Sequence, residues 1–93
     1  MKIIQSRSFA KRVKKFSNAH KLILDKQIKI ILENPLIGIE KKGDLREVFV
    51  HKFKIKTIQY LLAYRYSRNT LELIMIGPHQ NYYRNLKKQL KTK

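Results

Sequence analysis

The apolar residues in the first part of the chain follow helical spacing. Ile3-Ile4 is a short apolar pair that predicts an opening strand. Phe9, Val13 and Phe16 then recur at intervals of four and three residues, with basic residues between them. Residues at that spacing share one face of a helix, so the pattern predicts an amphipathic, basic helix. A serine on either side of Arg7 is suited to cap its start.

A second apolar stripe follows a polar break at Ser17-Asn18, where Asn18 can cap a new helix. Its members are Leu24, Ile28, Ile31 and Leu32. The helix is expected to end at Asn34-Pro35, because the residue before a proline is driven out of the helical region. The two helices should therefore form a hairpin.

The middle of the chain predicts an antiparallel meander. A loop over residues 36–44, which holds two of the three glycines, comes first. The expected strands are residues 47–56, 58–66 and 71–76. Ser67-Arg68-Asn69 suits the turn between the last two strands, because asparagine tolerates the left-handed conformation.

The end of the chain returns to helical spacing. Beyond Pro78, apolar or aromatic residues repeat every four residues at Tyr82, Leu86 and Leu90, which predicts a C-terminal helix. We therefore predict one α+β domain over residues 1–93, in the order β-α-α-β-β-β with a C-terminal helix. The antiparallel meander would pack on the helical hairpin.

The charge of the chain is strongly one-sided. Lysine and arginine number 22 against 6 acidic residues, which gives a formal net charge of +16 on 93 residues. Such a domain repels itself unless an anionic partner neutralises it. Nucleic acid or an acidic protein is therefore the expected partner.

Several classes of function are excluded. The chain has no cysteine, which rules out disulfides, thiolate zinc sites and thiol nucleophiles. It contains no cluster with metal-ligand spacing and no motif for a small-molecule cofactor. No stretch approaches the ~20 apolar residues of a membrane span, and the apolar start is too short for a signal peptide. We expect a soluble, cytoplasmic protein that acts without metal, cofactor or membrane.

Basic side chains alternate along the strand expected at residues 47–56. In an extended segment, Lys52, Lys54 and Lys56 share one face, and aromatic or apolar side chains occupy the other. Ammonium groups so close together repel one another, which favours an anion lying across them. The same row could instead be a solvated edge of the sheet.

A second group of polar residues, Gly77, His79 and Tyr83, follows the last expected strand. In a small, basic chain with this order of elements, the segment resembles the C-terminal part of the RelE/ParE superfamily of toxins from bacterial type II toxin-antitoxin modules. The resemblance covers nearly the whole chain. Its most specific part, residues 61–66 together with residues 73–87, is similar to a ParE-like branch of the superfamily.

The resemblance implies a microbial-RNase-like fold, a cognate acidic antitoxin that wraps the toxin, and one of two targets. RelE-type members cut mRNA on the ribosome, whereas ParE-type members poison DNA gyrase without a known hydrolytic centre. Our leading hypothesis is an mRNA interferase, an endoribonuclease that blocks translation and arrests growth. The alternatives are a gyrase inhibitor and a non-catalytic nucleic-acid-binding module.

Candidate catalytic residues follow from the same resemblance. The lysines of the first meander strand correspond to Lys52 and Lys54, the basic residue after the last strand to His79, and the late tyrosine to Tyr83 or its neighbour Tyr82. Cleavage of RNA by its own 2′-hydroxyl needs a base, an acid and cations around phosphorus. Imidazole exchanges protons near neutral pH, so His79 is the natural proton carrier. Tyr83 can stack on a base or assist proton transfer.

These residues also have plainer interpretations. His79 could be a turn or cap residue before the last helix. Tyr82 is more simply an anchor of that helix, and His51, which alternates with Phe49 and Phe53, is more simply a histidine on the core face.

One position departs from the RelE pattern. The arginine expected near the start of the middle strand is Leu61 in this chain. Phosphate stabilisation would then fall to Arg65, two pleats further on the same face, or to Arg84. The candidates for general contacts to nucleic acid are Lys56, Arg84, Lys87, Lys11 and Lys14.

Overall fold

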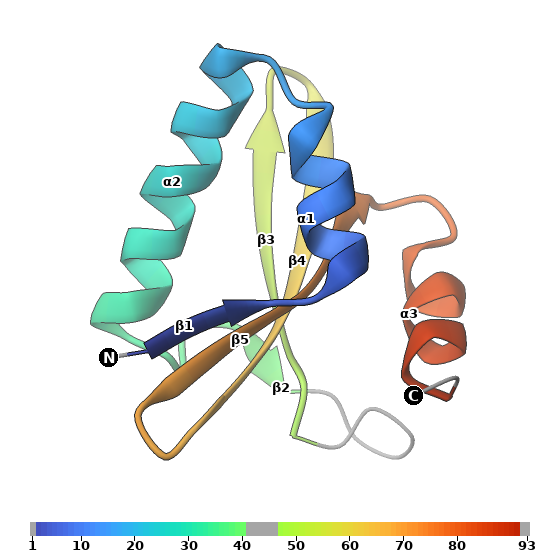
Figure 1. The fold of residues 1–93 in the computed structure, drawn as a ribbon. Helices are drawn as coiled ribbons and strands as arrows, with labels where there is room; N and C mark the ends of the chain where they lie inside the picture. Colours follow the sequence, from blue (N-terminus) through green and yellow to red (C-terminus); the bar gives the residue numbers. More distant parts are fainter. Residues whose placement is uncertain (1, 41–46, 92–93) are drawn as a thin grey trace.

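The computed structural model describes residues 2–40 and 47–91 and shows a twisted sheet with helices packed on it (Figure 1). In chain order the elements are β1 (Lys2–Gln5), α1 (Arg7–Lys14), α2 (Asn18–Glu33), β2 (Ile39–Glu40), β3 (Phe49–Ile55), β4 (Ile58–Ser67), β5 (Thr70–Pro78) and α3 (Tyr82–Lys91). The predicted α+β class and the succession of helices and strands are confirmed, with the short β2 as an addition.

The sheet has the strand order β1-β5-β4-β3-β2. Strands β3, β4 and β5 form the predicted antiparallel meander, and β1 joins its edge parallel to β5. The hairpin between β4 and β5 turns at Arg68 and Asn69, whose φ angles are 50° and 59°. Two left-handed central residues are typical of the type I′ turn that suits a twisted hairpin, so the predicted turn is confirmed.

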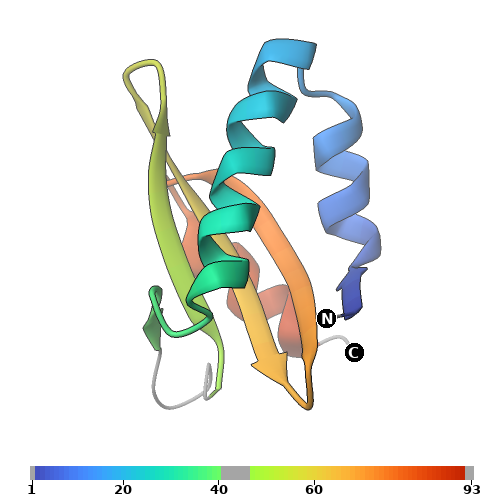
Figure 2. The same cartoon turned by 90° about the vertical axis from the view of Figure 1, so that its left-hand side faces the viewer.

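Helices α1 and α2 both pack on one side of the sheet (Figures 1 and 2). The hydroxyl of Ser6 caps α1 by accepting a hydrogen bond from the N–H of Phe9. Helix α2 is capped by Ser17, which accepts from the N–H of His20 at 3.2 Å, so the prediction of Asn18 as the cap was wrong by one residue. Polar side chains with a free oxygen compete for this position, and adjacent ones are hard to separate in advance.

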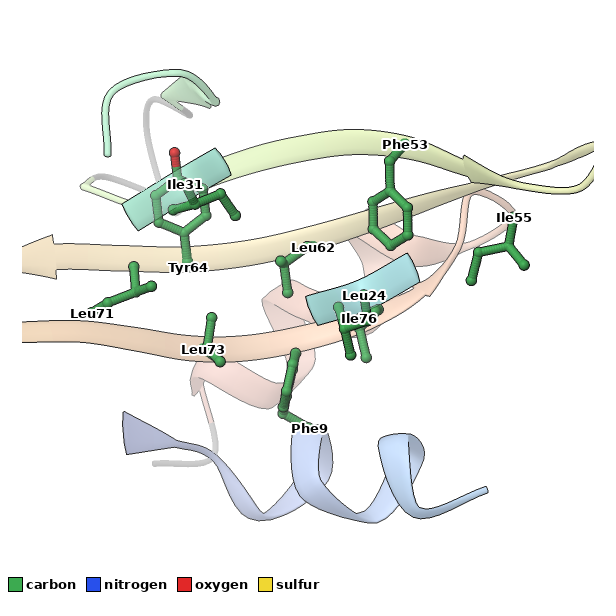
Figure 3. Packing of buried hydrophobic residues seen from close by; sticks show 10 residues of the cluster. All are labelled: Phe9, Leu24, Ile31, Phe53, Ile55, Leu62, Tyr64, Leu71, Leu73 and Ile76. Carbon is green, nitrogen blue, oxygen red and sulfur yellow. The ribbon is translucent and has the colours of Figure 1, made fainter. Parts of the chain in front are cut away.

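The core between this helical hairpin and the sheet is apolar and aromatic. Figure 3 shows how side chains from α1, α2 and the meander gather between the layers. Its buried members are Phe9, Leu24, Ile31, Phe53, Ile55, Leu62, Tyr64, Leu71, Leu73 and Ile76. The predicted helical stripes thus supply Phe9, Leu24 and Ile31 to the centre of this core.

A second core lies on the opposite face of the sheet, where α3 packs. Its buried members are Val48, Val50, Leu61, Ala63, Ile74, Tyr82 and Leu86. Alternate residues of β4 therefore serve different cores: Leu62 and Tyr64 face the hairpin, and Leu61 and Ala63 face α3. Covered on both faces, β4 reads as a continuous apolar run in the sequence.

Several expected boundaries change: β3 begins at Phe49 instead of Glu47, and β5 covers Thr70–Pro78 instead of residues 71–76. Strand β3 also ends at Ile55, so the prediction that Lys56 belongs to the strand was wrong: it lies in the tight turn to β4, with a φ of 57°. Part of the loop expected at residues 36–44 contains β2, which pairs with β3. A strand of two residues carries no periodicity that could separate it from a loop. Residues 41–46 lie outside the described part of the chain.

Candidate functional site

The register of the sheet brings the strand lysines and His79 to the same level. Lys54 pairs with Gln59 across β3 and β4, and the N–H of His79 donates to the carbonyl of Gln59 at 3.0 Å. Lys54 and His79 therefore flank one residue of β4. Neighbouring strands are about 4.8 Å apart, so the Cα atoms of the two residues are separated by about 10 Å.

A second row of paired residues crosses the three strands two positions away from Lys54 and Gln59, on the same face of the sheet. Lys52 pairs with Leu61, and Leu61 pairs with Gly77. By alternation, Lys52 and Lys54 share the face of β3 that buries Val50 in the second core, which is the face covered by α3. Both lysines are exposed, so their ammonium groups stand at the rim of that face and not beneath it.

The backbone of His79 is fixed at both of its polar groups. Its N–H bonds Gln59, and its carbonyl accepts from the N–H of Tyr82 at 3.2 Å. The residue is exposed, so the imidazole is accessible on a backbone anchored between β5 and α3. This geometry suits a turn residue and leaves the ring available for proton transfer.

Tyr82 anchors α3 to the sheet. It is 1% exposed, and its hydroxyl accepts from the N–H of Ala63 at 2.9 Å and donates to the carbonyl of Met75 at 2.7 Å. These two backbone groups flank a β-bulge at Ala63/Tyr64, where the ladder is interrupted. Burial raises the pKa of Tyr82 well above its ordinary value, so this phenol stays protonated. The anchoring interpretation of Tyr82 is confirmed.

Removing this hydroxyl should destabilise the fold. Tyr82→Phe leaves the N–H of Ala63 and the carbonyl of Met75 without their partner, which costs about 1–3 kcal/mol in the free energy of unfolding. The midpoint of thermal unfolding should fall by several degrees. Tyr66→Phe, a change at a partly exposed tyrosine of β4, should shift it less. Equal midpoints for the two variants would contradict the anchoring role.

Tyr83 lies beside this anchor. It is partly buried against the second core, and its ring meets that of Tyr82 edge to face at a centroid distance of 5.7 Å. Further along α3, Arg84 and Lys87 are exposed and three residues apart, so they share one face of the helix. Helix α3 thus carries an aromatic and two cationic groups that were candidates from the sequence.

Arg65 is not grouped with the lysines. It pairs with Glu72 across β4 and β5, and its Nη1 lies 3.2 Å from Oε1 of Glu72. It lies four positions after Leu61, which corresponds to about 13 Å along a strand. The structure therefore does not bring Arg65 to the lysines, and its guanidinium has an anionic partner in Glu72; its role in phosphate stabilisation stays a prediction.

Leu61 itself is completely buried in the second core. An arginine at this position would have to leave the core or bury its charge. The departure from the RelE pattern is thus part of the packing.

His51 lies on the face of β3 opposite to Lys52 and Lys54. Its Nε2 is 2.7 Å from Oε1 of Gln27, and its ring stacks on that of Phe53. Burial lowers the pKa of His51. Its predicted place on the core face is confirmed.

A cavity of about 420 Å³ opens between α1, β5 and α3. It is lined by Ser8, Lys11, Arg12, Lys15, Met75, Ile76, Asn85 and Gln89. Lys11 was a candidate from the sequence, whereas Lys14 does not line the cavity. Arg12 and Lys15 were missed, although the spacing of Ser8, Arg12 and Lys15 places them on one side of the helix.

The described residues contain no group of three or more histidine, aspartate or glutamate side chains that could hold a metal ion. Within the same part of the chain, no helix is long and apolar enough to cross a membrane.

Comparisons with known proteins agree on the fold. A family model described as the ParE-like toxin of the type II bacterial toxin-antitoxin system matches residues 3–87. Among solved structures, the chain is similar to the toxin-antitoxin complex RelBE of E. coli, with a TM-score of 0.66 and 20% identity over 82% of this chain and 93% of the other. The isolated E. coli RelE toxin matches with a TM-score of 0.65 and 20% identity, over 94% of this chain and 96% of the other. No curated protein matches the chain.

Proposed function

The chain belongs to the ParE-like toxins of type II bacterial toxin-antitoxin systems, and we propose that it acts as RelE-type members of the superfamily do, by cutting mRNA on the ribosome. It is then an mRNA interferase whose active site lies on the rim of the sheet face that α3 covers. The observation that supports this proposal is the register that places Lys52, Lys54 and His79 around Gln59 and Leu61, two residues of β4 that share one face.

The reaction needs neither metal nor cofactor. The 2′-oxygen of a ribose attacks the adjacent phosphorus as its proton passes to a base, and the bond from phosphorus to the 5′-oxygen breaks as that oxygen takes up a proton. The products are a 2′,3′-cyclic phosphate and a 5′-hydroxyl. His79 exchanges a proton with the reacting oxygens, and Lys52 and Lys54 stabilise the charge on the phosphoryl oxygens. Tyr83 stacks on a base or assists proton transfer.

Direct observation of the cut tests this function. Purified protein is added to ribosomes stalled on a defined message, and the 5′ ends of the fragments are mapped by primer extension. A new end within the ribosomal A site supports the proposal. Intact message at saturating protein refutes it.

Two observations favour the gyrase alternative. The first is that the matching family model is the one for ParE-like toxins, and the second concerns Leu61. Leu61 occupies the place of an arginine expected in RelE-type nucleases and is built into the second core. A face with fewer cations suits a toxin that binds a protein target without hydrolysing RNA. Inhibition of DNA supercoiling by purified gyrase tests this alternative.

The cognate partner is proposed to be a small acidic antitoxin that covers the basic surface. Since opposite charges steer the encounter, the association rate should fall steeply as salt is raised, while the dissociation rate changes less. Stopped-flow mixing of the purified partners between 0.05 and 0.5 M salt, a range of roughly one decade, measures both rates. A salt-independent association rate, or a neighbouring gene without a small acidic product, would contradict this partner.

A further inference from the structure

The cavity between α1 and α3 begins where the sheet loses its edge strand. Strand β1 pairs with β5 only as far as Leu73, and the chain then turns into α1 (Figure 1). Beyond that point the carbonyl of Ile74 accepts hydrogen bonds from the hydroxyl of Ser6 and from Nε2 of Gln89, the latter at 3.0 Å. Ser8 donates to Oε1 of Gln89 at 2.8 Å. The walls from α1 and α3 are therefore joined across the edge of β5.

The lining of this cavity carries positive charge without compensation. Lys11, Arg12 and Lys15 project from α1, and none of the described residues that line the cavity is acidic. Like charges at a spacing of four residues, as in Lys11 and Lys15, weaken a helix. The remaining polar lining consists of the hydroxyl of Ser8, which donates to Gln89, and the amides of Asn85 and Gln89. The three cationic groups, with the amide of Asn85 beside them, fit a phosphate group.

Arg12 connects the cavity to the row that contains Lys52. A Cβ atom built on Gly77 would lie 3.7 Å from Nη2 of Arg12 and 3.7 Å from Cδ2 of Tyr82. The guanidinium thus lies over the end of the row formed by Lys52, Leu61 and Gly77. The two outer Cα atoms of that row are about 10 Å apart.

We propose that the cavity between α1 and α3 binds a backbone phosphate of a single-stranded RNA, with Arg12 as the principal contact. The inference rests on the proposed function, because it assigns a second contact to the strand whose scissile phosphate lies at Lys52, Lys54 and His79. An acidic peptide offers carboxylates to the same cations. RNA is favoured because the cationic groups continue from the cavity toward Lys52 through Arg12, and because the partly exposed side chain of Met75 offers an apolar floor for a base or ribose.

Binding of a fluorescent single-stranded RNA to the full chain tests this site without ribosomes. Arg12→Gln should raise the Kd about tenfold, since a charge-assisted contact is lost. It should also reduce the slope of log Kd against log salt by about 0.7, the value for one phosphate contact with a single strand. Lys29→Gln on α2 removes the same charge at an exposed position outside the cavity and should change both quantities less. Arg12→Lys, which keeps the charge, should lie between wild type and Arg12→Gln. Circular dichroism verifies that each variant is folded.

The outcomes separate the two proposals. Equal RNA affinity for the Arg12→Gln and Lys29→Gln proteins overturns the phosphate site. Loss of affinity for the acidic antitoxin in Arg12→Gln, with RNA binding unchanged, also overturns it and assigns the cavity to the antitoxin. If Arg12→Gln weakens RNA binding but the wild-type protein cuts no message on ribosomes, the phosphate site stands and the endonuclease function fails.

Discussion

Replacing His79 with alanine should reduce cleavage of ribosome-bound mRNA by about 10²–10⁴-fold, the usual loss when a general acid or base is removed. Stability should hardly change, because the residue is exposed and its fixed hydrogen bonds come from the backbone. A surface substitution of this kind shifts the free energy of unfolding by about 0.5 kcal/mol or less. Single-turnover cleavage and thermal unfolding of the same preparations measure the two effects.

Gln80→Ala provides the matched control for His79→Ala. Gln80 is the next residue in the same turn and is also exposed, so the change disturbs the turn to a similar degree without removing the imidazole. Its cleavage rate should stay close to that of the wild type. If His79→Ala lowers the thermal midpoint strongly, the plainer role of His79 as a turn residue accounts for any loss of activity.

Lys52→Ala and Lys54→Ala should each reduce the rate of cleavage by about 10²–10³-fold while ribosome binding persists. Groups that contact the scissile phosphate act more strongly on the transition state than on the bound substrate. Lys11→Ala and Lys14→Ala, on α1, should instead destabilise the bound substrate and the transition state to the same extent, as the loss of a general contact to RNA does. These two changes therefore raise the half-saturating ribosome concentration and leave the single-turnover rate nearly unchanged. Comparison of the single-turnover rate with the half-saturating ribosome concentration separates the two classes of lysine.

Lys26→Ala on α2 controls for the loss of one charge in these measurements. Lys52 and Lys54 are not catalytic if Lys26→Ala loses as much activity as Lys52→Ala and Lys54→Ala do. If the wild-type protein cuts no message and inhibits DNA supercoiling by gyrase at a comparable concentration, the gyrase alternative replaces the endonuclease proposal.

The sequence predicts those parts of the fold that repeat along the chain. Both helices of the hairpin, the three meander strands and the turn at Arg68 and Asn69 leave periodic or conformational signals that a single chain displays. The chain was less informative at element ends, since Lys56 continues the alternation of β3 although it already lies in the turn. Alternation reports which face a side chain shares, not where a strand stops.

The sequence predicts which face of a strand carries the candidate residues. It does not predict which residues of other strands lie beside them. The shared face of Lys52 and Lys54 follows from the strand period, but their level relative to His79 depends on the register of two hairpins. The engagement of Arg65 by Glu72 depends on the same register. Arg12 could not be placed, because its approach to Gly77 depends on how α1 leaves the edge of the sheet.

The double coverage of β4 limits how this toxin can evolve. The four consecutive residues Leu61, Leu62, Ala63 and Tyr64 are all fully buried, alternately in one core and the other. In this chain none of them can gain a charged side chain without loss of packing. Selection for a new target would therefore act first on β3, on the turn after β5 and on the helices, where side chains reach solvent. A charge on β4, such as the arginine that the RelE pattern has at the position of Leu61, requires compensating changes in the second core.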